Sequence, residues 1–241
     1  MPFHNYSEHK QQLTRLQCRR GGWRRTVRSN HGSPTPANAV ATMMGSLIAQ
    51  PFDALGSPLP KAVMTELAAT SPTLIVFSGL PGSGKSTLAQ GLSIALAVTM
   101  FSVDPIEAEM LRAGVARAHT GTAAYEVAQA LAGEHLQLGH SVIIDAVNPV
   151  EAPRAAWRRL AAKHHAQLKI IECVCADEAI HRQRIEKRVR NIAGLPEVAW
   201  TDVLKRRAEY EAWADARLVL ETSRASPEQS LSEALAYTSG P

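Results

Sequence analysis

The sequence contains no run of about 20 apolar residues, the length that a membrane-spanning helix requires. Cysteine is scarce, since Cys18, Cys173 and Cys175 are an odd number that forms no disulfide framework and suits a reducing cytoplasm. No matching Cys or His pair follows Cys173 and Cys175, so these two residues are predicted to be small core side chains rather than metal ligands. We therefore expect a cytoplasmic protein without a membrane segment.

Positive charge is concentrated in one part of the chain. The whole sequence has 26 Lys and Arg against 22 Asp and Glu, a net charge of +4. Residues 1–70 hold 8 basic and 3 acidic residues, whereas residues 71–241 hold 18 basic and 19 acidic residues. Nucleic-acid binding needs clustered positive charge on the binding domain. This distribution disfavours a nucleic-acid substrate.

Residues 1–70 contain glycine and proline breakers that leave no apolar periodicity long enough for a packed element, apart from a weak helix near 62–69. This basic segment is predicted to be mostly disordered. Its Arg-rich residues 1–30 lack the apolar region of a secretory signal, but they are compatible with an organellar transit peptide. Alternative starts of the chain are Met43, Met44 and Met64.

From residue 71 onward, strands and helices are predicted to alternate, with no internal repeat. This alternation is typical of an α/β domain with a parallel sheet covered on both faces. The predicted strands are residues 74–77, 98–103, 141–147, 168–174 and 217–221. The predicted helices are residues 86–97, 107–113, 123–138, 152–165, 178–190, 200–213 and 227–237. The helix at 152–165 is expected to place Arg154, Arg158 and Arg159 on a polar face.

The strongest motif is Gly79-Leu80-Pro81-Gly82-Ser83-Gly84-Lys85-Ser86, which matches G-x-x-x-x-G-K-[ST] between a predicted buried strand and a predicted helix. Its glycines allow backbone N–H groups to turn inward and cradle phosphates, and the N-terminus of the next helix favours negative charge. Lys85 is expected to reach the β- and γ-phosphates, and the Ser86 hydroxyl to bind Mg²⁺. The alternative is a structural glycine-rich turn.

Two acidic residues end the second and third predicted strands. Parallel α/β sheets bind ligands at the carboxyl ends of their strands, so Asp104 and Asp145 are expected near the γ-phosphate. The alternatives are a helix N-cap before Pro105 for Asp104, and a carboxylate bonded to the nearby loop for Asp145. Arg184 and Arg188 are four residues apart and share one face of a charged helix, whose alternative role is a solvated surface.

These stretches resemble the P-loop kinases of the polynucleotide-kinase, zeta-toxin and chloramphenicol-phosphotransferase type, and in particular bacterial predicted kinases of the AAA-type ATP-binding family. Residues 77–89, 102–104, 139–146 and 184–188 carry the resemblance, in the family's order and approximate spacing. It implies an α/β P-loop NTPase fold, a three-layer sandwich with a five-stranded parallel sheet in the order 2-3-1-4-5 and a helical lid. The kinase domain would span residues 71–241, with its lid near residues 182–199.

The same resemblance implies ATP with Mg²⁺ as the phosphate donor and a role for each matching residue. Asp104 corresponds to the carboxylate that orients or deprotonates the acceptor hydroxyl. Asp145 corresponds to the acid that holds Mg²⁺ through water, and the lid arginines stabilise the transferring phosphoryl group. The expected catalytic residues are Lys85, Asp104, Arg184 and Arg188. The expected nucleotide-binding residues are Gly79, Pro81, Gly82, Ser83, Gly84, Lys85, Ser86, Thr87 and Arg182, and the expected Mg²⁺ ligands are Ser86 and Asp145.

One residue departs from the family's pattern. Related kinases with phosphorylated or nucleic-acid substrates often carry an arginine three residues after the second-strand aspartate, where this chain has Glu107. A glutamate repels a substrate phosphate and can pair with an amine or with hydroxyls, although Arg112 or Arg117 could compensate. We therefore expect the acceptor to be a hydroxyl of a small molecule, bound between residues 104–117 and the helix at 123–138.

Two other functions are compatible with the phosphate loop alone, an ATPase acting as a switch or motor, and a nucleotide-binding regulator without a dedicated acceptor. The sequence lacks the Asn-Lys-x-Asp signature of guanine specificity, and the residues after Asp145 are not the Asp-x-x-Gly of a GTPase switch. These absences favour the kinase. The sequence does not indicate the identity of the acceptor or an oligomeric state.

Overall fold

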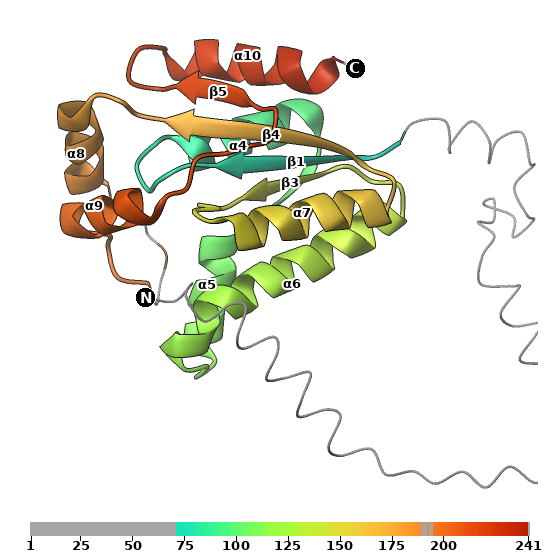
Figure 1. Ribbon diagram of the computed structural model, residues 1–241, viewed down its shortest axis with the longest axis horizontal. Coiled ribbons are helices and arrows are strands. Elements are labelled where there is room, and N and C mark those ends of the chain that lie inside the picture. The colour runs from blue at the N-terminus through green and yellow to red at the C-terminus, as the bar shows by residue number, and fades with distance from the viewer. Residues whose placement is uncertain (1–70, 189–191, 193–194, 241) are drawn as a thin grey trace, which may run out of the picture. The chain divides into compact units, whose positions relative to one another are not determined.

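The computed structural model of the protein describes residues 71–188, 192 and 195–240. They form a five-stranded parallel sheet with helices on both faces (Figure 1). The α/β P-loop NTPase sandwich with strand order 2-3-1-4-5 is therefore confirmed, while the predicted disorder of residues 1–70 lies outside the described residues. The strands are β1 (Thr73–Ser78), β2 (Thr99–Ser102), β3 (Val142–Asp145), β4 (Gln167–Val174) and β5 (Leu218–Glu221), in the order β2-β3-β1-β4-β5.

The helices of the described chain cover the sheet in two layers. In Figure 1, α6 and α7 lie along one face of the sheet, and α4 and α10 along the other. None of these helices is long and apolar enough to cross a membrane. Their bounds are α4 (Lys85–Leu96), α5 (Val103–Arg112), α6 (Arg117–Gln137), α7 (Glu151–Lys163), α8 (Glu178–Lys187), α9 (Trp200–Glu209) and α10 (Pro227–Ser239).

The central strand β1 is buried on both faces of the sheet. Its side chains alternate, so that Leu74 and Val76 join the apolar cluster under α6 and α7, whereas Ile75 and Phe77 join the cluster under α4 and α10. Burial of each such side chain contributes roughly 1.5–3 kcal/mol. Because both faces are covered, the strand is a continuous apolar run rather than an alternating one.

The parallel register brings the carboxyl ends of the strands to one edge of the sheet. Phe77 of β1 and Ser102 of β2 both pair with Asp145 of β3. The labelled strands in Figure 1 all point toward the side where α8 and α9 lie. The loops that follow the strands therefore meet at the edge where α/β sheets bind ligands.

Several helix boundaries differ from the predicted ones. Helix α5 begins at Val103 instead of residue 107, so Pro105 lies in the first turn, where a missing N–H costs nothing. Helix α6 begins at Arg117 instead of residue 123. Helix α9 ends at Glu209 instead of residue 213, because Tyr210 adopts an extended backbone and its hydroxyl bonds the Ser78 hydroxyl at 2.8 Å.

Helix α8 ends at Lys187, whereas the prediction extended it to residue 190. The backbone of Arg188 is extended, with φ −71° and ψ 128°. Residues 189 and 190 lie outside the described residues. Of the predicted lid, residues 182–199, the structure therefore describes residues 182–188, 192 and 195–199.

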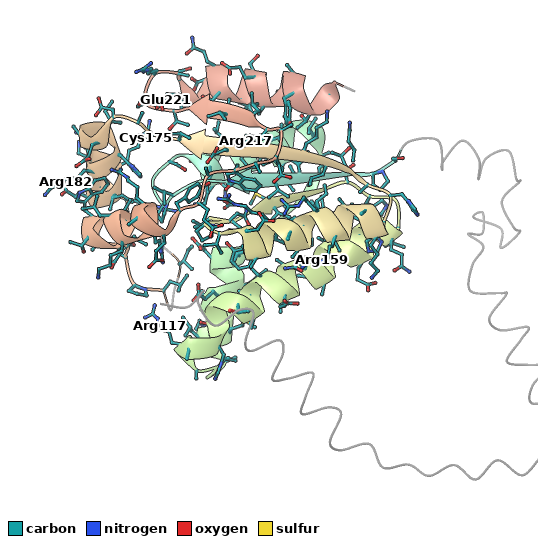
Figure 2. The ribbon with its side chains drawn as sticks, viewed as in Figure 1. Arg117, Arg159, Cys175, Arg182, Arg217 and Glu221 are labelled. Atoms are coloured by element: carbon teal, nitrogen blue, oxygen red, sulfur yellow. The ribbon has the colours of Figure 1, made fainter. Side chains whose placement is uncertain are left out.

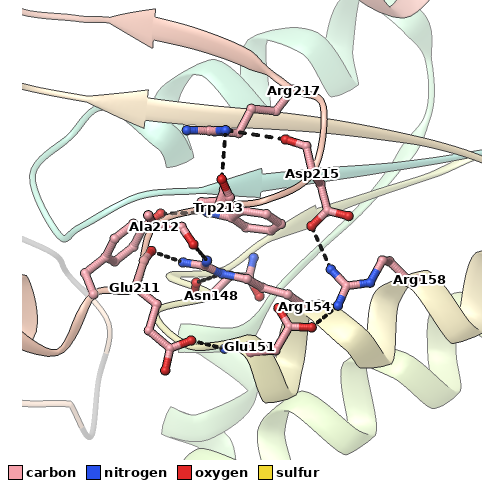
Figure 3. A network of polar contacts seen from close by, with 10 residues as sticks. Asn148, Glu151, Arg154, Arg158, Glu211, Ala212, Trp213, Asp215 and Arg217 are labelled. Carbon is pink, nitrogen blue, oxygen red and sulfur yellow. Dashed lines mark hydrogen bonds and ion pairs between the residues drawn. The ribbon is translucent and has the colours of Figure 1, made fainter.

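The prediction that Arg154 lies on a polar face is wrong. Its side chain is only 2% exposed, and its guanidinium lies 4.1 Å from the centre of the Trp213 ring. Figure 3 shows the network around it. Nε donates to the Asn148 carbonyl at 3.0 Å, and Nη1 donates to the Ala212 carbonyl at 3.0 Å. Nη2 donates to the Glu211 carbonyl at 2.8 Å. Burial lowers the pKa of this guanidinium below its usual value.

The network joins two segments that are distant in the sequence. One is the loop between β3 and α7, and the other is the segment that follows α9. Sequence periodicity could not show this, because the acceptors are main-chain carbonyls that only the fold brings together. Arg158 and Arg159 differ from Arg154, since Arg158 pairs with Asp215 at 2.6 Å near the surface and Arg159 is exposed.

Replacement of Arg154 by leucine should destabilise the protein by about 3 kcal/mol, because it leaves buried carbonyls without donors. The free energy of unfolding, measured by urea titration, would show this loss. The matched control is Arg159→Leu on the same helix, which should change the free energy by no more than about 0.5 kcal/mol. Equal effects of the two substitutions would contradict this role of Arg154.

Candidate active site

The loop between β1 and α4 has a backbone conformation that requires glycine. Gly79, Gly82 and Gly84 have φ angles of 136°, 82° and 87°. A Cβ atom at Gly79 would lie 2.3 Å from the carbonyl oxygen of Cys173 on β4, so no larger residue fits. Gly84 precedes α4 without a side-chain cap, which leaves the first N–H groups of the helix available to an anion.

A cavity of about 410 Å³ opens beside this loop and gathers positive charge. Four cationic side chains line it, and within the described chain no carboxylate does. Lys85, at the start of α4, is only 4% exposed. Such a concave site suits the polyphosphate of a nucleotide. The cationic lining residues are Lys85, Arg184, Lys187 and Arg188, and the predicted Gly82, Gly84, Ser86 and Thr87 also line the cavity.

Thr222, the residue after β5, positions both the loop and a lid arginine. Its hydroxyl donates to the Ser83 carbonyl at 2.9 Å. Arg184 donates through Nη1 to this hydroxyl oxygen at 2.8 Å and through Nη2 to the Thr222 carbonyl at 2.7 Å. The sequence analysis missed Thr222, although its place at the carboxyl end of the last strand could have indicated it. The first turn of α10, with Pro227 and Ser230, lines the same cavity and was also missed.

Four predicted nucleotide-binding residues do not line this cavity. Gly79, Pro81 and Ser83 belong to the loop but do not line the cavity. Ser83 is buried, with 1% of its surface exposed. Arg182 extends away from α8 (Figure 2), with 60% of its side chain exposed and its Nε 2.7 Å from Glu186 Oε1. Residues two positions apart in a helix point to nearly opposite sides. Arg182 therefore faces solvent when Arg184 faces the cavity. Arg182 therefore lies outside this cavity.

Asp145 fits the predicted Mg²⁺ site. It is 4% exposed, and its Oδ2 accepts a hydrogen bond from Ser102 Oγ at 3.0 Å. Its Oδ1 is buried without a hydrogen-bond partner in the described part of the chain. Such an unsatisfied oxygen costs about 1–3 kcal/mol, and a Mg²⁺-bound water would satisfy it. Mg²⁺ commonly takes few protein ligands together with water and substrate phosphates, as a site built from Ser86 and Asp145 would require.

Asn148 holds the loop that follows β3. It is fully buried, with φ 48°. Its Nδ2 donates to the Phe77 carbonyl at 3.1 Å, and its Oδ1 accepts from Trp157 Nε1 at 2.9 Å. Its backbone N–H donates to the hydroxyl of Tyr125 at 3.0 Å, and burial raises the pKa of that hydroxyl. Asn148, which the sequence analysis did not assign to the site, therefore fixes the strand end that carries Asp145.

A second cleft, of about 730 Å³, lies at the carboxyl ends of β2 and β3. Asp104 and Glu107 of α5 line it, together with Arg117 and Tyr125 of α6. The sequence placed the acceptor pocket between these two segments. Helix α9 and the residues before it complete the lining, which the sequence did not indicate. The structure thus brings Asp104 into a cleft that shares no lining residue with the cationic cavity.

His181 of α8 packs the lid against the phosphate loop. Its Nε2 lies 2.7 Å from the Pro81 carbonyl, and its Nδ1 lies 3.3 Å from Arg207 Nη2. Arginine is only a donor, so Nδ1 accepts and Nε2 carries the proton that it donates to Pro81. A Cβ at Gly82 would lie 2.8 Å from Cδ1 of Ile185, one turn further along α8. Burial lowers the pKa of His181, and the nearby arginine guanidinium adds to this effect.

The strand order, the glycine loop and the cationic cavity define a P-loop NTPase. A family model described as an AAA domain (AAA_33) matches residues 74–210, more than half of the chain, and the protein belongs to this family. Curated relatives of Mycobacterium tuberculosis and Mycobacterium bovis, each called an uncharacterized protein, are 27% identical over 150 residues. The match covers 57% of this chain, which spans only about 30% of the length of these relatives.

Solved structures share the fold. A candidate kinase of Chloroflexus aurantiacus is similar with a TM-score of 0.59 and 20% identity, over 70% of this chain and 99% of that one. A sugar kinase of a Janibacter species has a TM-score of 0.54 and 19% identity, over 70% and 95%. Kti12 of Chaetomium thermophilum, in complex with ADP-AlF3, has a TM-score of 0.52 and 19% identity, over 70% and 100%. At these identities the likeness establishes the fold alone.

Replacement of Gly82 by alanine should lower nucleotide affinity by roughly tenfold or more, because the new methyl group meets α8 and displaces the loop. The control is Gly139→Ala, where φ is also positive at 80° but nothing lies within 4 Å of the added Cβ. Both changes should cost about 1 kcal/mol of stability from the backbone conformation. Titration with fluorescent ADP distinguishes the two variants, since only Gly82→Ala should bind it more weakly. Equal nucleotide affinities would contradict the contact between the Gly82 position and α8.

His181 should make stability depend on pH. Its native pKa lies below the ordinary value of 6.5, so the unfolded state binds the proton more readily. The stabilisation is present above pH 6.5 and is lost as the pH falls through the lowered native pKa. His181→Gln should remove this part of the pH dependence, whereas His140→Gln at an exposed position should keep it. Urea unfolding at a series of pH values measures both, and an unchanged slope in His181→Gln would refute the assignment.

Proposed function

We propose that the protein is an ATP-dependent kinase that transfers the γ-phosphate of ATP to a hydroxyl of a small molecule. The observation that carries this proposal is the presence of two different recesses at one edge of the sheet. One is lined by four cations, and the other contains Asp104. A protein that only binds or hydrolyses a nucleotide has no need for the second recess.

The cationic cavity would hold the nucleotide. Lys85 and the N-terminus of α4 would neutralise the β- and γ-phosphates, while Arg184 and Arg188 would stabilise the charge that develops on the transferring phosphoryl group. The two bonds from Arg184 to Thr222 hold the guanidinium in place before the nucleotide binds. Little side-chain entropy is then lost on binding, which favours catalysis by positioning.

The loop and β3 would hold Mg²⁺. The Ser86 hydroxyl would bind the ion, and Asp145 would accept a hydrogen bond from a water on it through the buried Oδ1. When bound, the ion neutralises part of the phosphate charge. Ser102 Oγ, by donating to the other carboxylate oxygen, fixes the direction in which Oδ1 points.

Asp104 would act on the acceptor. It lies in the first turn of α5, which begins directly after β2, and it lines the 730 Å³ cleft. Its carboxylate would accept the proton of the acceptor hydroxyl while the hydroxyl oxygen bonds to the γ-phosphorus. The bond from that phosphorus to the bridging oxygen breaks, and ADP leaves with the electron pair.

The finer assignments are part of this proposal. The motif pattern supports a kinase of the polynucleotide-kinase, zeta-toxin and chloramphenicol-phosphotransferase type. Glu107 in the acceptor cleft argues against a nucleic-acid substrate, and the low cysteine content supports a cytoplasmic location. The sugar kinase among the structural neighbours agrees with a small-molecule acceptor.

ADP release, measured with and without a panel of hydroxyl-bearing metabolites, tests the function. Lys85→Ala should abolish turnover. Asp104→Asn should lower transfer by about 10²-fold or more while sparing ATP binding, because it removes only the base. The matched control is Glu109→Gln on the same helix, since Glu109 is exposed and pairs with Arg112.

Three outcomes would contradict the proposal. Full transfer by Asp104→Asn would show that another group is the base. Fast ATP hydrolysis that no acceptor stimulates would indicate an NTPase. Tight nucleotide binding with no turnover under any condition would indicate a regulator.

A further inference from the structure

Hydrogen bonds join the phosphate loop, which forms the cationic cavity, to the lining of the second cleft. Among the residues that the structure describes, the two recesses share no lining residue. Val147, in the loop that follows β3, lines the second cleft. Its carbonyl accepts hydrogen bonds from the Gly79 N–H at 3.3 Å and from the Ser78 hydroxyl at 3.0 Å. The first residue of the phosphate loop is therefore bonded directly to a residue that lines the cleft.

Tyr210, the residue after α9, extends this link to the opposite wall of the cleft. Because the single O–H of Ser78 donates to Val147, its oxygen accepts from the Tyr210 hydroxyl, 2.8 Å away. Trp213 Nε1 in turn donates to the Tyr210 oxygen at 3.1 Å. Such a chain of hydrogen bonds is strengthened by mutual polarisation. Burial raises the pKa of Tyr210 above its ordinary value, so the hydroxyl keeps the proton that it donates.

Arg207 joins α9 to the phosphate loop at a second point. Its Nη2 donates to His181 Nδ1 at 3.3 Å, and His181 Nε2 donates to the Pro81 carbonyl at 2.7 Å. The guanidinium also lies 3.3 Å from the Glu178 carboxylate and 5.3 Å from the centre of the Trp200 ring. Because an arginine can only donate, Arg207 selects the tautomer of His181 that donates to the loop.

Helix α9, which these two links hold, is a wall of the second cleft. Asp202, Arg206 and Glu209 of this helix line the cleft. Arg207 and Tyr210 line neither recess, so they can act on a bound ligand only by holding other groups in place. When the two links break, the loop loses bonds that set its conformation. A nucleotide binds the loop in one conformation and therefore favours the state in which α9 is attached.

We propose that a nucleotide in the cationic cavity holds α9 in place as a wall of the second cleft, and that Tyr210 and Arg207 are the positioning residues that carry this coupling. The coupling is reciprocal, so attachment of α9 also raises the affinity for the nucleotide. It requires a nucleotide in the cavity but no transfer to an acceptor. The coupling and the proposed kinase function can therefore be tested separately.

Hydrogen exchange of backbone amides, followed by mass spectrometry on the full chain with and without ADP and Mg²⁺, measures the opening of α9. ADP should slow exchange in residues 200–209 about tenfold, because opening of α9 then costs part of the nucleotide binding free energy. Exchange in the phosphate loop should also slow. Residues 130–137 at the end of α6 line neither recess and should exchange at an unchanged rate.

Two substitutions remove the links without changing the lining of either recess. Tyr210→Phe deletes one hydroxyl, and Arg207→Gln deletes the guanidinium. Each should lower ADP affinity about threefold to tenfold, the equivalent of one hydrogen bond, and should reduce the effect of ADP on exchange in α9. The matched controls are Tyr237→Phe on α10, whose hydroxyl has no hydrogen bond among the described residues, and Lys205→Gln, 76% exposed on α9. Both controls should keep the wild-type ADP affinity and protection of α9.

The outcomes distinguish the coupling from the kinase function. Exchange in α9 that is the same with and without ADP, while the phosphate loop is protected, would overturn the coupling. Full protection of α9 by ADP in Arg207→Gln and Tyr210→Phe would overturn the role of these two residues. Arg207 has 38% of its side chain exposed, so Arg207→Gln should fold even if Tyr210→Phe does not. Protection of α9 by ADP in a protein that transfers phosphate to no hydroxyl would support the coupling and overturn the kinase.

Discussion

The backbone of the loop between β1 and α4 packs directly against other elements, and the shape of the cationic cavity depends on this contact. At Gly79 the loop touches the β4 carbonyl of Cys173, and at Gly82 it touches α8. Thr222 bonds the loop from β5. The conformation of the loop is thus set by its neighbours before any phosphate binds. The same contacts place α8 so that Arg184 faces the cavity.

The sequence predicts this loop and the elements that flank it well because the signals are local. A buried strand, a glycine loop and a helix follow one another without interruption, so the loop and the strand order are recovered. The positions of Asp104 and Asp145 at strand ends were also predicted, since strand ends mark the ligand edge of a parallel sheet, whereas their roles stay predictions. The second cleft contains Asp104 and lies where the sequence analysis expected the acceptor pocket, and its use by an acceptor stays a prediction.

Contacts between distant segments are what the sequence could not show. Arg154 looks like a surface arginine by periodicity, yet carbonyls more than fifty residues away in the chain bury it. Thr222 and Asn148 act through hydrogen bonds to loops that only the fold brings near. Arg182 lies outside the cationic cavity for a simpler reason, because it shares a helix with Arg184 but points to the other side. Asp202 and Glu209 of α9 line the second cleft only because the tertiary fold brings α9 beside α5 and α6.

Arg154 anchors the segment after α9 through main-chain oxygens alone, apart from the aromatic ring that stacks on it. The Arg154 anchor does not depend on the side chain at position 212, whereas the Glu211 carboxylate adds a bond from the Glu151 N–H at 2.7 Å. The cleft wall that carries Glu209 lies directly before the anchored segment. Substitutions in this part of α9 can therefore leave the main-chain contacts of the next segment unchanged. The architecture thus separates the side chains that line this cleft from the main-chain contacts that hold the neighbouring segment in place.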